Sequence, residues 1–302
     1  MSYENKLFDF VSNDERFVVM TAENRAPIKN ISHKLGRRFI DTGITEQCMV
    51  GAAAGLALRG RIVVAHALAS FLTMRAYEFI RTDIGIPKLP VKLIGFVPGI
   101  LSDGNGPTHQ ALEDISLMRS IPNMRIFCPC DEEELSNALE TILLDPYPWY
   151  IRYVSCSTSI KNKAAFEIGK SEILSNGEDA AIITYGFITN NVYECLKILE
   201  SQKLNVTLIN LRTLSPIDED LIEKIVQKFK IVFTVEDHFL KGGVYSIIGE
   251  ICLKNNISTK IYPISLGEKW FKPGRLQEAL NFAGLSPKKL SDCIMEKIKN
   301  IK

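Results

Sequence analysis

The chain has 302 residues, enough for two domains, and its composition is that of an ordinary α/β protein. Its 36 basic and 35 acidic residues leave a formal net charge of +1, which gives no electrostatic reason to expect a nucleic-acid or anionic-membrane partner. The seven cysteines are odd in number and lie mostly in apolar runs, and no apolar stretch approaches the ~18 residues of a membrane span. We therefore expect a cytoplasmic protein with reduced thiols that contacts neither nucleic acid nor membrane.

Strands and helices alternate through the first half of the chain. An amphipathic helix over 3–11 precedes a buried strand over 16–20, and a short strand over 38–41 leads through a glycine turn into a nearly uncharged helix over 48–58. The remaining elements expected here are strands over 62–65, 91–96, 124–127 and 149–152, and helices over 71–81, 112–119 and 132–144. Nearly continuous apolar strands between helices predict a parallel sheet that is covered on both faces.

The second half repeats this alternation after a polar segment. Residues 156–170 are the predicted linker between a domain over 1–155 and a domain over 171–302. In the second domain we expect strands over 180–186, 205–211 and 231–235, helices over 190–201, 219–228 and 244–254, and a final pair of helices. The predicted fold class is therefore α/β, with two domains that each contain a mainly parallel sheet flanked by helices around a core of its own.

A single acid, Glu46, stands at the mouth of the nearly uncharged helix. Free amide groups and the helix dipole favour a carboxylate there by about 0.3 to 1 kcal/mol, so a plain helix-start acid is one interpretation. The small residues Gly51 and Gly55 would let another helix approach closely, which favours a buried helix. An acid at the mouth of a buried helix is expected to face a cleft or a subunit seam.

Three blocks of sequence, in this order, resemble the pyrimidine-binding half of the transketolase family of thiamine diphosphate enzymes. They are the runs from Asp41 to Gly60, from Ser70 to Tyr77 and from Gly106 to Gln110. Two later segments resemble the C-terminal domain that transketolase shares with deoxyxylulose-phosphate synthase and the beta subunits of 2-oxo acid dehydrogenases. They are Arg212 to Asp218, and Val235 to His238 followed by Gly242 and Gly243. The resemblance implies a pyrimidine-binding domain followed by a chiefly architectural domain.

The resemblance implies that Glu46, Phe71, Leu68 and Met74 bind the cofactor. In the family, an acid at the position of Glu46 hydrogen-bonds a ring nitrogen of the cofactor pyrimidine, and an aromatic ring at the position of Phe71 stacks on that pyrimidine. Core packing is the alternative for Phe71. Leu68 and Met74 stand where the family often has two further aromatic residues, so aliphatic contacts are expected there.

Substrate contacts are implied for His109 and Arg152. In the family, the histidine of the Gly-Pro-Thr-His-Gln block contacts the donor substrate and assists proton transfer, so Glu46 and His109 are the expected catalytic residues. Arg152 matches a position that binds a substrate phosphate, for which a guanidinium offers two parallel hydrogen bonds. An ordinary salt bridge is the alternative for this arginine.

Two departures from the family pattern concern the substrate. Asn105 stands where transketolase and deoxyxylulose-phosphate synthase usually carry an Asp that recognises a substrate hydroxyl, and Val97 stands where transketolase has a His near the donor. His66 is a candidate for the missing imidazole, with a buried structural histidine as its alternative. A substrate hydroxyl left without a hydrogen-bond partner costs ~1 to 3 kcal/mol. The changes at Asn105 and Val97 therefore predict a substrate whose hydroxyl groups differ from those of the usual family substrates.

The family's other half binds the diphosphate and Mg²⁺ through a Gly-Asp-Gly motif, which this sequence lacks. The run from Ser102 to Gly106 has the wrong spacing and position for that motif. Since hard oxygen ligands and a helix mouth are needed for Mg²⁺ and the diphosphate, we expect a separately encoded N-terminal subunit to hold both. The expected assembly is a heterotetramer with two copies of each subunit, and we predict no metal ligands in this chain.

The function implied by the resemblance is that of the C-terminal subunit of a split transketolase, which transfers a two-carbon ketol unit from a ketose phosphate to an aldose acceptor. Decarboxylative transfer from pyruvate, as in deoxyxylulose-phosphate synthase, is the nearest alternative. A 2-oxo acid dehydrogenase beta subunit and a non-catalytic regulatory paralogue are further alternatives. The presence of Glu46, Phe71 and His109 argues against the regulatory paralogue, since a non-catalytic protein needs none of these residues.

Overall fold

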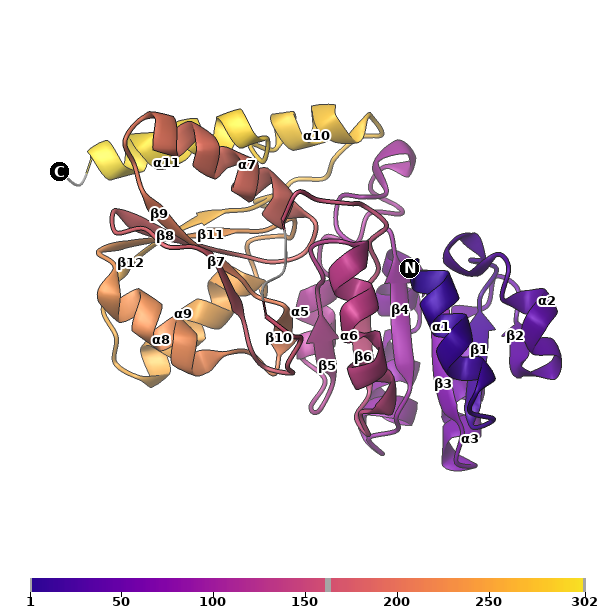
Figure 1. The fold of residues 1–302 in the computed structure, drawn as a ribbon. Coiled ribbons are helices and arrows are strands. Elements are labelled where there is room, and N and C mark those ends of the chain that lie inside the picture. Colours follow the sequence, from indigo (N-terminus) through magenta and orange to yellow (C-terminus); the bar gives the residue numbers. More distant parts are fainter. Residues whose placement is uncertain (1, 161–163, 301–302) are drawn as a thin grey trace.

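Two sheets, one in each half of the molecule, form the frame of the computed structural model (Figure 1). The structure describes residues 2–160 and 164–300, so residues 161–163 of the predicted linker lie outside the described residues. The first sheet has the strand order β10-β5-β6-β4-β3-β1-β2. Its strands from the first half of the chain are β1 (Phe17–Thr21), β2 (Phe39–Asp41), β3 (Ile62–Leu68), β4 (Lys92–Phe96), β5 (Arg125–Phe127) and β6 (Trp149–Arg152).

Helices cover both faces of the first sheet, as the apolar strands predicted. Strands β1 to β6 are paired in parallel, and β1, β4 and β6 are almost wholly buried because neither face meets water. The helices of this half are α1 (Tyr3–Ser12), α2 (Ser32–Leu35), α3 (Glu46–Leu58), α4 (Tyr77–Phe79), α5 (Asp114–Arg119) and α6 (Glu132–Leu144). Short 3₁₀ turns are η1 (Ala26–Ile28), η2 (Gly36–Arg38) and η5 (Asp103–Asn105).

The prediction of an α-helix over 71–81 is wrong about the type of helix. This part of the chain forms two π-helical segments, η3 (Phe71–Arg75) and η4 (Ile80–Gly85), on either side of the short helix α4. A π-helical turn closes i to i+5 hydrogen bonds, is rare, and frequently occurs at functional sites. Apolar periodicity alone does not distinguish it from an α-helix, because the two windings bury similar faces.

The second sheet has the order β12-β11-β8-β9-β7, and only its edge pair β7–β9 is antiparallel. Its strands are β7 (Glu172–Ser175), β8 (Ala180–Thr184), β9 (Val206–Asn210), β11 (Ile231–Val235) and β12 (Lys260–Ile264). The three central strands were predicted, whereas the edge strands β7 and β12 were missed because edge strands are less apolar and β12 contains Pro263. The helices are α7 (Ile188–Ser201), α8 (Glu219–Lys228), α9 (Val244–Lys254), α10 (Leu276–Phe282) and α11 (Pro287–Lys299).

The two halves share a sheet and a core, which corrects the expectation of two separate cores. Strand β10 (Thr213–Ser215) belongs to the C-terminal half but pairs antiparallel with β5 at the edge of the first sheet. One continuous hydrophobic cluster runs from α3 and α5 of the first half to α8 and α9 of the second. Two further clusters pack α1 and α6 on the first sheet, and α7 and α11 on the second.

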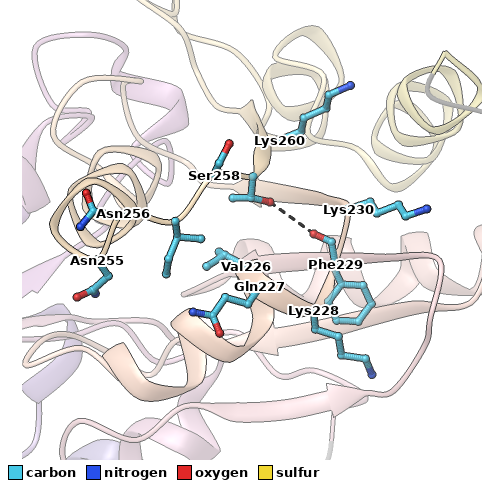
Figure 2. A pocket seen from close by; sticks show the side chains of 11 residues that line it. Val226, Gln227, Lys228, Phe229, Lys230, Asn255, Asn256, Ser258 and Lys260 are labelled. Carbon is cyan, nitrogen blue, oxygen red and sulfur yellow. Dashed lines mark hydrogen bonds between the residues drawn. The ribbon is translucent and has the colours of Figure 1, made fainter.

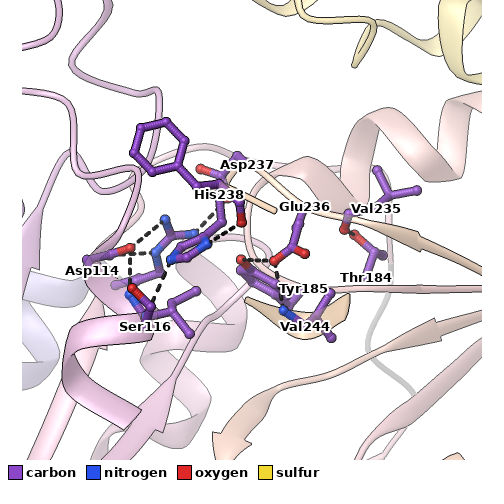
Figure 3. Close-up of polar contacts among 12 residues, drawn as sticks. Asp114, Ser116, Thr184, Tyr185, Val235, Glu236, Asp237, His238 and Val244 are labelled. Atoms are coloured by element: carbon purple, nitrogen blue, oxygen red, sulfur yellow. Dashed lines mark hydrogen bonds and ion pairs between the residues drawn. The ribbon is translucent and has the colours of Figure 1, made fainter. Parts of the chain in front are cut away.

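Buried ion pairs join the two halves at this interface (Figure 3). The guanidinium of Arg152 is 1% exposed and donates from Nε to Asp114 at 2.9 Å and from Nη1 to Asp237 at 2.7 Å. Arg212 likewise pairs with Glu134 at 3.0 Å and with Glu172 at 2.7 Å. Removing one member of such a buried pair leaves an uncompensated charge and costs about 3 to 5 kcal/mol.

Glu236 precedes Asp237 and is held by contacts within the second half. Its carboxyl group accepts hydrogen bonds from the backbone of Val244 at 2.8 Å and Tyr245 at 3.2 Å at the start of α9, and from the hydroxyl of Tyr185 at 3.2 Å (Figure 3). Burial raises the pKa of Glu236 to about 7 in the folded chain, from an ordinary value of 4.5.

Among the described residues, no helix is long and apolar enough to cross a bilayer.

The raised pKa of Glu236 makes the stability of the fold depend on pH. Between pH 4.5 and 7 the unfolded chain loses the Glu236 proton while the folded chain keeps it, so this residue's contribution falls as pH rises. Relative to Glu236→Gln, which cannot titrate, the wild type should lose roughly 2 to 3 kcal/mol between pH 5 and pH 8. Urea unfolding of both chains at the two pH values measures this difference, and a difference that does not change with pH would contradict the burial of a titrating Glu236.

Candidate active site

Three of the predicted site residues follow parallel strands whose C-terminal ends lie at one edge of the first sheet. Strands β1 to β4 are parallel, so their C-terminal ends meet at this edge, where open α/β sheets place ligand loops. Glu46 follows β2 across the loop 42–45, Phe71 follows β3, and His109 lies in the loop 97–113 that follows β4. We call this the C-terminal edge of the first sheet.

Glu46 is the first residue of α3 and is 2% exposed. Its Oε2 atom lies 2.7 Å from Nη1 of Arg75, whose side chain is 40% exposed. A buried carboxylate is costly unless a counter-charge or hydrogen-bond donors accompany it. Arg75 therefore provides in this chain the cation that Glu46 requires.

The same arginine stacks on Phe71. The guanidinium carbon of Arg75 lies 4.3 Å from the centre of the Phe71 ring, a cation–π distance. The ring of His109 meets Phe71 edge-on, with 4.9 Å between ring centroids and an interplanar angle of 60°. Glu46, Arg75, Phe71 and His109 therefore form one continuous set of contacts, which we call the pocket cluster.

Arg75 is the member of the pocket cluster that the sequence analysis missed. It lies in the π-helical segment η3, four residues after Phe71, and side chains with this spacing share one helix face. The available signal was a lone cation in an otherwise apolar helical run, four positions after an aromatic residue. Leu68 ends β3 and is partly buried, and Met74 precedes Arg75 and is 36% exposed. Both flank the cluster along the chain, and their cofactor contacts stay predictions.

The loop 97–113 carries His109 and the two departures from the family pattern. His109 is half-buried and its Nδ1 lies 2.9 Å from Oγ1 of Thr108. Asn105 is exposed and donates from Nδ2 to Oγ of Ser102 at 3.3 Å. Val97 opens the loop at φ 46°, a conformation that costs a β-branched residue about 1 to 3 kcal/mol. The contacts of the loop must compensate for that cost.

The structure places His66 outside the pocket cluster. Its ring is fully buried, with Nε2 2.8 Å from the hydroxyl of Tyr3 and Nδ1 3.3 Å from the carbonyl of Met20. Burial lowers the pKa of His66 to about 4, so the ring is neutral. These contacts favour the structural alternative over the role of a substrate imidazole, which the sequence could not decide because Tyr3 is distant in the chain.

Arg152 also lies away from the cluster, in the interface between the two halves. All three of its guanidinium nitrogens donate to carboxylates, two to Asp114 and one to Asp237. A guanidinium that is buried and already paired is not available to a substrate phosphate. The structure therefore favours the salt-bridge alternative, and we do not carry Arg152 into the proposal as a phosphate ligand.

Two cavities bear on where a ligand would bind. A cavity of about 250 Å³ opens at the C-terminal ends of β4 and β6; its lining residues are Phe96, Val97, Leu101, Tyr153, Val154, Ser155 and Cys156. A larger cavity of about 750 Å³ lies in the second half, where Figure 2 shows Lys228, Lys230 and Lys260 around it. The larger cavity lies before β11 and β12, at the edge opposite to the strand ends that bind ligands in such sheets. We therefore regard the C-terminal edge of the first sheet as the candidate site.

Within residues 2–160 and 164–300, no three or more His, Cys, Asp or Glu side chains are grouped so as to hold a metal ion. The donor set of the pocket cluster is instead one carboxylate, one guanidinium, one imidazole and an aromatic face. Such a set suits a planar, nitrogen-containing organic ligand rather than a metal.

Comparison with known proteins identifies the family. Residues 2–155 match the model of the transketolase pyrimidine-binding domain, and residues 169–290 match that of the transketolase C-terminal domain. A Methanocaldococcus jannaschii protein, provisionally named as a transketolase C-terminal section, is 33% identical over 98% of this chain and 95% of its own length. A 6-deoxy-6-sulfo-D-fructose transketolase subunit from Clostridium sp. is 29% identical over 96% of this chain and 91% of its length.

Longer relatives and a solved structure agree with this assignment. The 1-deoxy-D-xylulose-5-phosphate synthase of Dictyoglomus thermophilum is 36% identical over 90% of this chain, which spans 44% of that enzyme. The structure of a split-gene transketolase, described as an inactive beta4 tetramer, superimposes with a TM-score of 0.86 and 27% identity over 98% of this chain and 96% of that chain. The chain belongs to the transketolase family, with the family's pyrimidine-binding and C-terminal domains in succession.

Proposed function

We propose that the chain is the pyrimidine-binding, C-terminal subunit of a split, thiamine diphosphate-dependent transketolase. It would act with a separately encoded subunit that holds the diphosphate and Mg²⁺, in a heterotetramer with two copies of each. The reaction is the transfer of a two-carbon ketol unit from a ketose phosphate to an aldose acceptor. The observation that carries the proposal is the pocket cluster, in which Arg75 links a buried carboxylate to an aromatic face and an imidazole touches that face.

The pocket cluster fits the aminopyrimidine end of the cofactor. Proteins of this family use thiamine diphosphate, which supplies the nucleophilic carbon that carries the transferred unit. Arg75 stacks its planar group on Phe71 and donates a hydrogen bond to Glu46. An aminopyrimidine is also planar and also carries N–H donors, so it can make the same two contacts. Glu46 would hold the proton at a pyrimidine ring nitrogen, and Phe71 would fix the plane of the ring.

His109 would act on the substrate beside this ring. Its imidazole touches Phe71 from the side, so it lies next to a pyrimidine stacked on that ring. An imidazole there can hydrogen-bond the oxygen of a donor carbonyl and move a proton to or from it. Asn105 lies on the same loop and would contact a substrate hydroxyl.

Exposed apolar side chains around α3 support a partner subunit. Ile44 precedes this helix and is 68% exposed, and Leu58 ends it and is 70% exposed. Phe79 and Ile86 lie in or next to the segments that pack against α3, and both are exposed as well. A partner subunit that packs along α3 and these segments would remove the four apolar side chains from water, which favours a protein contact.

The relatives that match this chain from end to end support a split enzyme. Both the Methanocaldococcus protein and the Clostridium subunit are covered over more than 90% of their own length. The split-gene transketolase that superimposes on the chain is described as inactive in its beta4 form. By analogy, we expect this chain alone to be inactive and to gain activity with the diphosphate-binding subunit.

Decarboxylative transfer from pyruvate is the second candidate reaction, because the deoxyxylulose-phosphate synthases are relatives of similar identity.

Reconstituted with its diphosphate-binding partner, thiamine diphosphate and Mg²⁺, the chain should release an aldose phosphate from a ketose phosphate donor and extend an added aldose by two carbons. The donor panel should include 6-deoxy-6-sulfofructose, because of the Clostridium relative. Carbon dioxide release from pyruvate without ketol transfer would favour the synthase reaction and contradict the proposal.

Replacing Glu46 tests the residue that the proposal depends on most. Glu46→Ala should assemble with the partner but lose 10²-fold or more in kcat, because positioned proton transfer contributes about 10² to 10⁴ in rate. Glu219→Ala is the matched control, since Glu219 is also the first residue of a helix and its loss should cost only about 0.3 to 1 kcal/mol of stability. Activity of the Glu46 variant close to that of the wild type would refute the assigned role.

A double-mutant cycle tests the contact between Glu46 and Arg75 in the chain itself. Glu46→Ala, Arg75→Ala and the double variant should show a coupling energy of about 0.5 to 3 kcal/mol in urea unfolding, because each group compensates the charge of the other. The exposed pair of Lys254 and Glu219 should show a coupling below about 1 kcal/mol. Strict additivity of the two single variants would mean that the Glu46 ion pair does not form.

A further inference from the structure

We infer that the C-terminal domain positions His109 by clamping the loop 97–113, and that Asp237 and Arg152 are positioning residues of the active site. The inference rests on the proposed function, because His109 is the substrate-facing residue of that proposal. It gives a task to a domain that the sequence resemblance marks only as architectural. The evidence comes from three groups of contacts along the loop.

The first group fixes the neck of the loop. Gly99 and Ala111 pair through two backbone hydrogen bonds of 3.1 and 3.0 Å, which close the loop on itself. Asp237 lies directly against this neck, since a Cβ atom on Gly99 would lie 1.7 Å from its Oδ2. Arg152 donates to the Asp237 carboxylate at 2.7 Å, and its Nη2 would lie 2.9 Å from the same Cβ atom. A residue of the second half thus supports the backbone of the loop at its narrowest point.

The second group follows the chain on from Asp237. The backbone N–H of Phe239 donates to the carbonyl of Leu112 at 2.8 Å, just after the neck. Nε2 of His238 accepts from the backbone N–H of Ser116 at 3.3 Å, while its Nδ1 faces the Phe239 carbonyl at 2.7 Å (Figure 3). Burial lowers the pKa of His238 to about 4, so the ring stays neutral and Nε2 keeps its acceptor role.

The third group holds the tip of the loop. A Cβ atom on Gly106 would lie 2.7 Å from the ring of Pro273, so the two segments are in close contact. The N–H of Gly274 donates to the carbonyl of Asp103 at 3.2 Å, and the N–H of His109 donates to the carbonyl of Gly106 at 3.0 Å. The C-terminal domain therefore contacts the loop at a point one hydrogen bond away from His109.

These contacts matter because the loop needs outside support. Val97 opens it in a positive-φ conformation that disfavours a β-branched residue. A loop released from the clamp would relax at this end and shift the His109 imidazole relative to Phe71. A displacement of about 1 Å in a reacting group can reduce the rate 10²-fold, so the clamp sets how well His109 reaches the substrate.

Asp237→Asn tests the inference in the assembled complex and in the free chain. In the complex, kcat should fall about tenfold or more, whereas thiamine diphosphate affinity should stay within about threefold of wild type, because Glu46 and Phe71 lie on other elements. In the free chain, labelling with ¹⁵N-histidine gives four imidazole spin systems, since the sequence has four histidines. The His109 signal should shift or broaden, and that of His33 should not.

Glu134→Gln is the matched control, because Glu134 also makes a buried ion pair between the two halves. Its partners Arg212, Cys130 and Asn210 lie outside the loop, so the variant should lose stability without moving the His109 signal or reducing kcat. If Asp237→Asn does not fold, Pro273→Gly replaces it, since this variant removes only the contact at the tip and should also shift the His109 signal.

The two measurements separate failure of this inference from failure of the proposed function. If Asp237→Asn and Glu134→Gln have the same His109 signal and the same kcat, the positioning role of Asp237 is overturned. A shifted His109 signal in a complex without ketol transfer would uphold the clamp and overturn the proposed function instead. The histidine spectrum needs neither the partner nor the cofactor, so it reports on the loop alone.

Discussion

The arrangement of the molecule depends on the neutralisation of one buried cation, Arg152. Removing a guanidinium from water costs several kcal/mol, so it is buried only with carboxylates in place to receive its hydrogen bonds. Asp114 supplies one from the start of α5 in the first half, and Asp237 supplies the other from the segment that follows β11 in the second. Because the two carboxylates come from different halves, satisfying this charge fixes where the second sheet lies relative to the first. Strand β10 and the shared apolar cluster strengthen the same junction.

The sequence predicted the alternation of elements and the central strands because both follow from local patterns of apolar residues. It also predicted Glu46, Phe71 and His109, which the structure brings into one cluster, because each lies in a recognisable block after a strand. The roles expected for His66 and Arg152 depended on burial and on partners far away in the chain. Those partners are Tyr3 for the histidine and Asp114 and Asp237 for the arginine, and no local pattern indicates such pairings.

The missed features have the same physical origin. Strand β10 is three residues long and exists because the edge of a sheet from the other half accepts it. The two π-helical segments η3 and η4 leave an apolar pattern that an α-helix would share. Arg75 was overlooked because a cation in a helical run is usually solvated, whereas here it stacks on an aromatic ring and reaches a buried acid. In the proposed function, the Arg75 guanidinium stacks on Phe71 and pairs with Glu46 until the aminopyrimidine ring of the cofactor takes over these contacts. The buried Glu46 carboxylate therefore has a counter-charge while the partner subunit and the cofactor are absent.

In the proposed function, this chain supplies only the pyrimidine side of a shared cofactor site. The most direct measurement is equilibrium binding of thiamine diphosphate in the presence of Mg²⁺, first to the purified chain and then to the chain mixed with its diphosphate-binding subunit. We expect no tight binding to the chain alone, tight binding to the pair, and loss of that binding in the pair when Phe71 is replaced by Ala. Tight binding to the isolated chain, or a pair that assembles and still binds no cofactor, would contradict the proposed function.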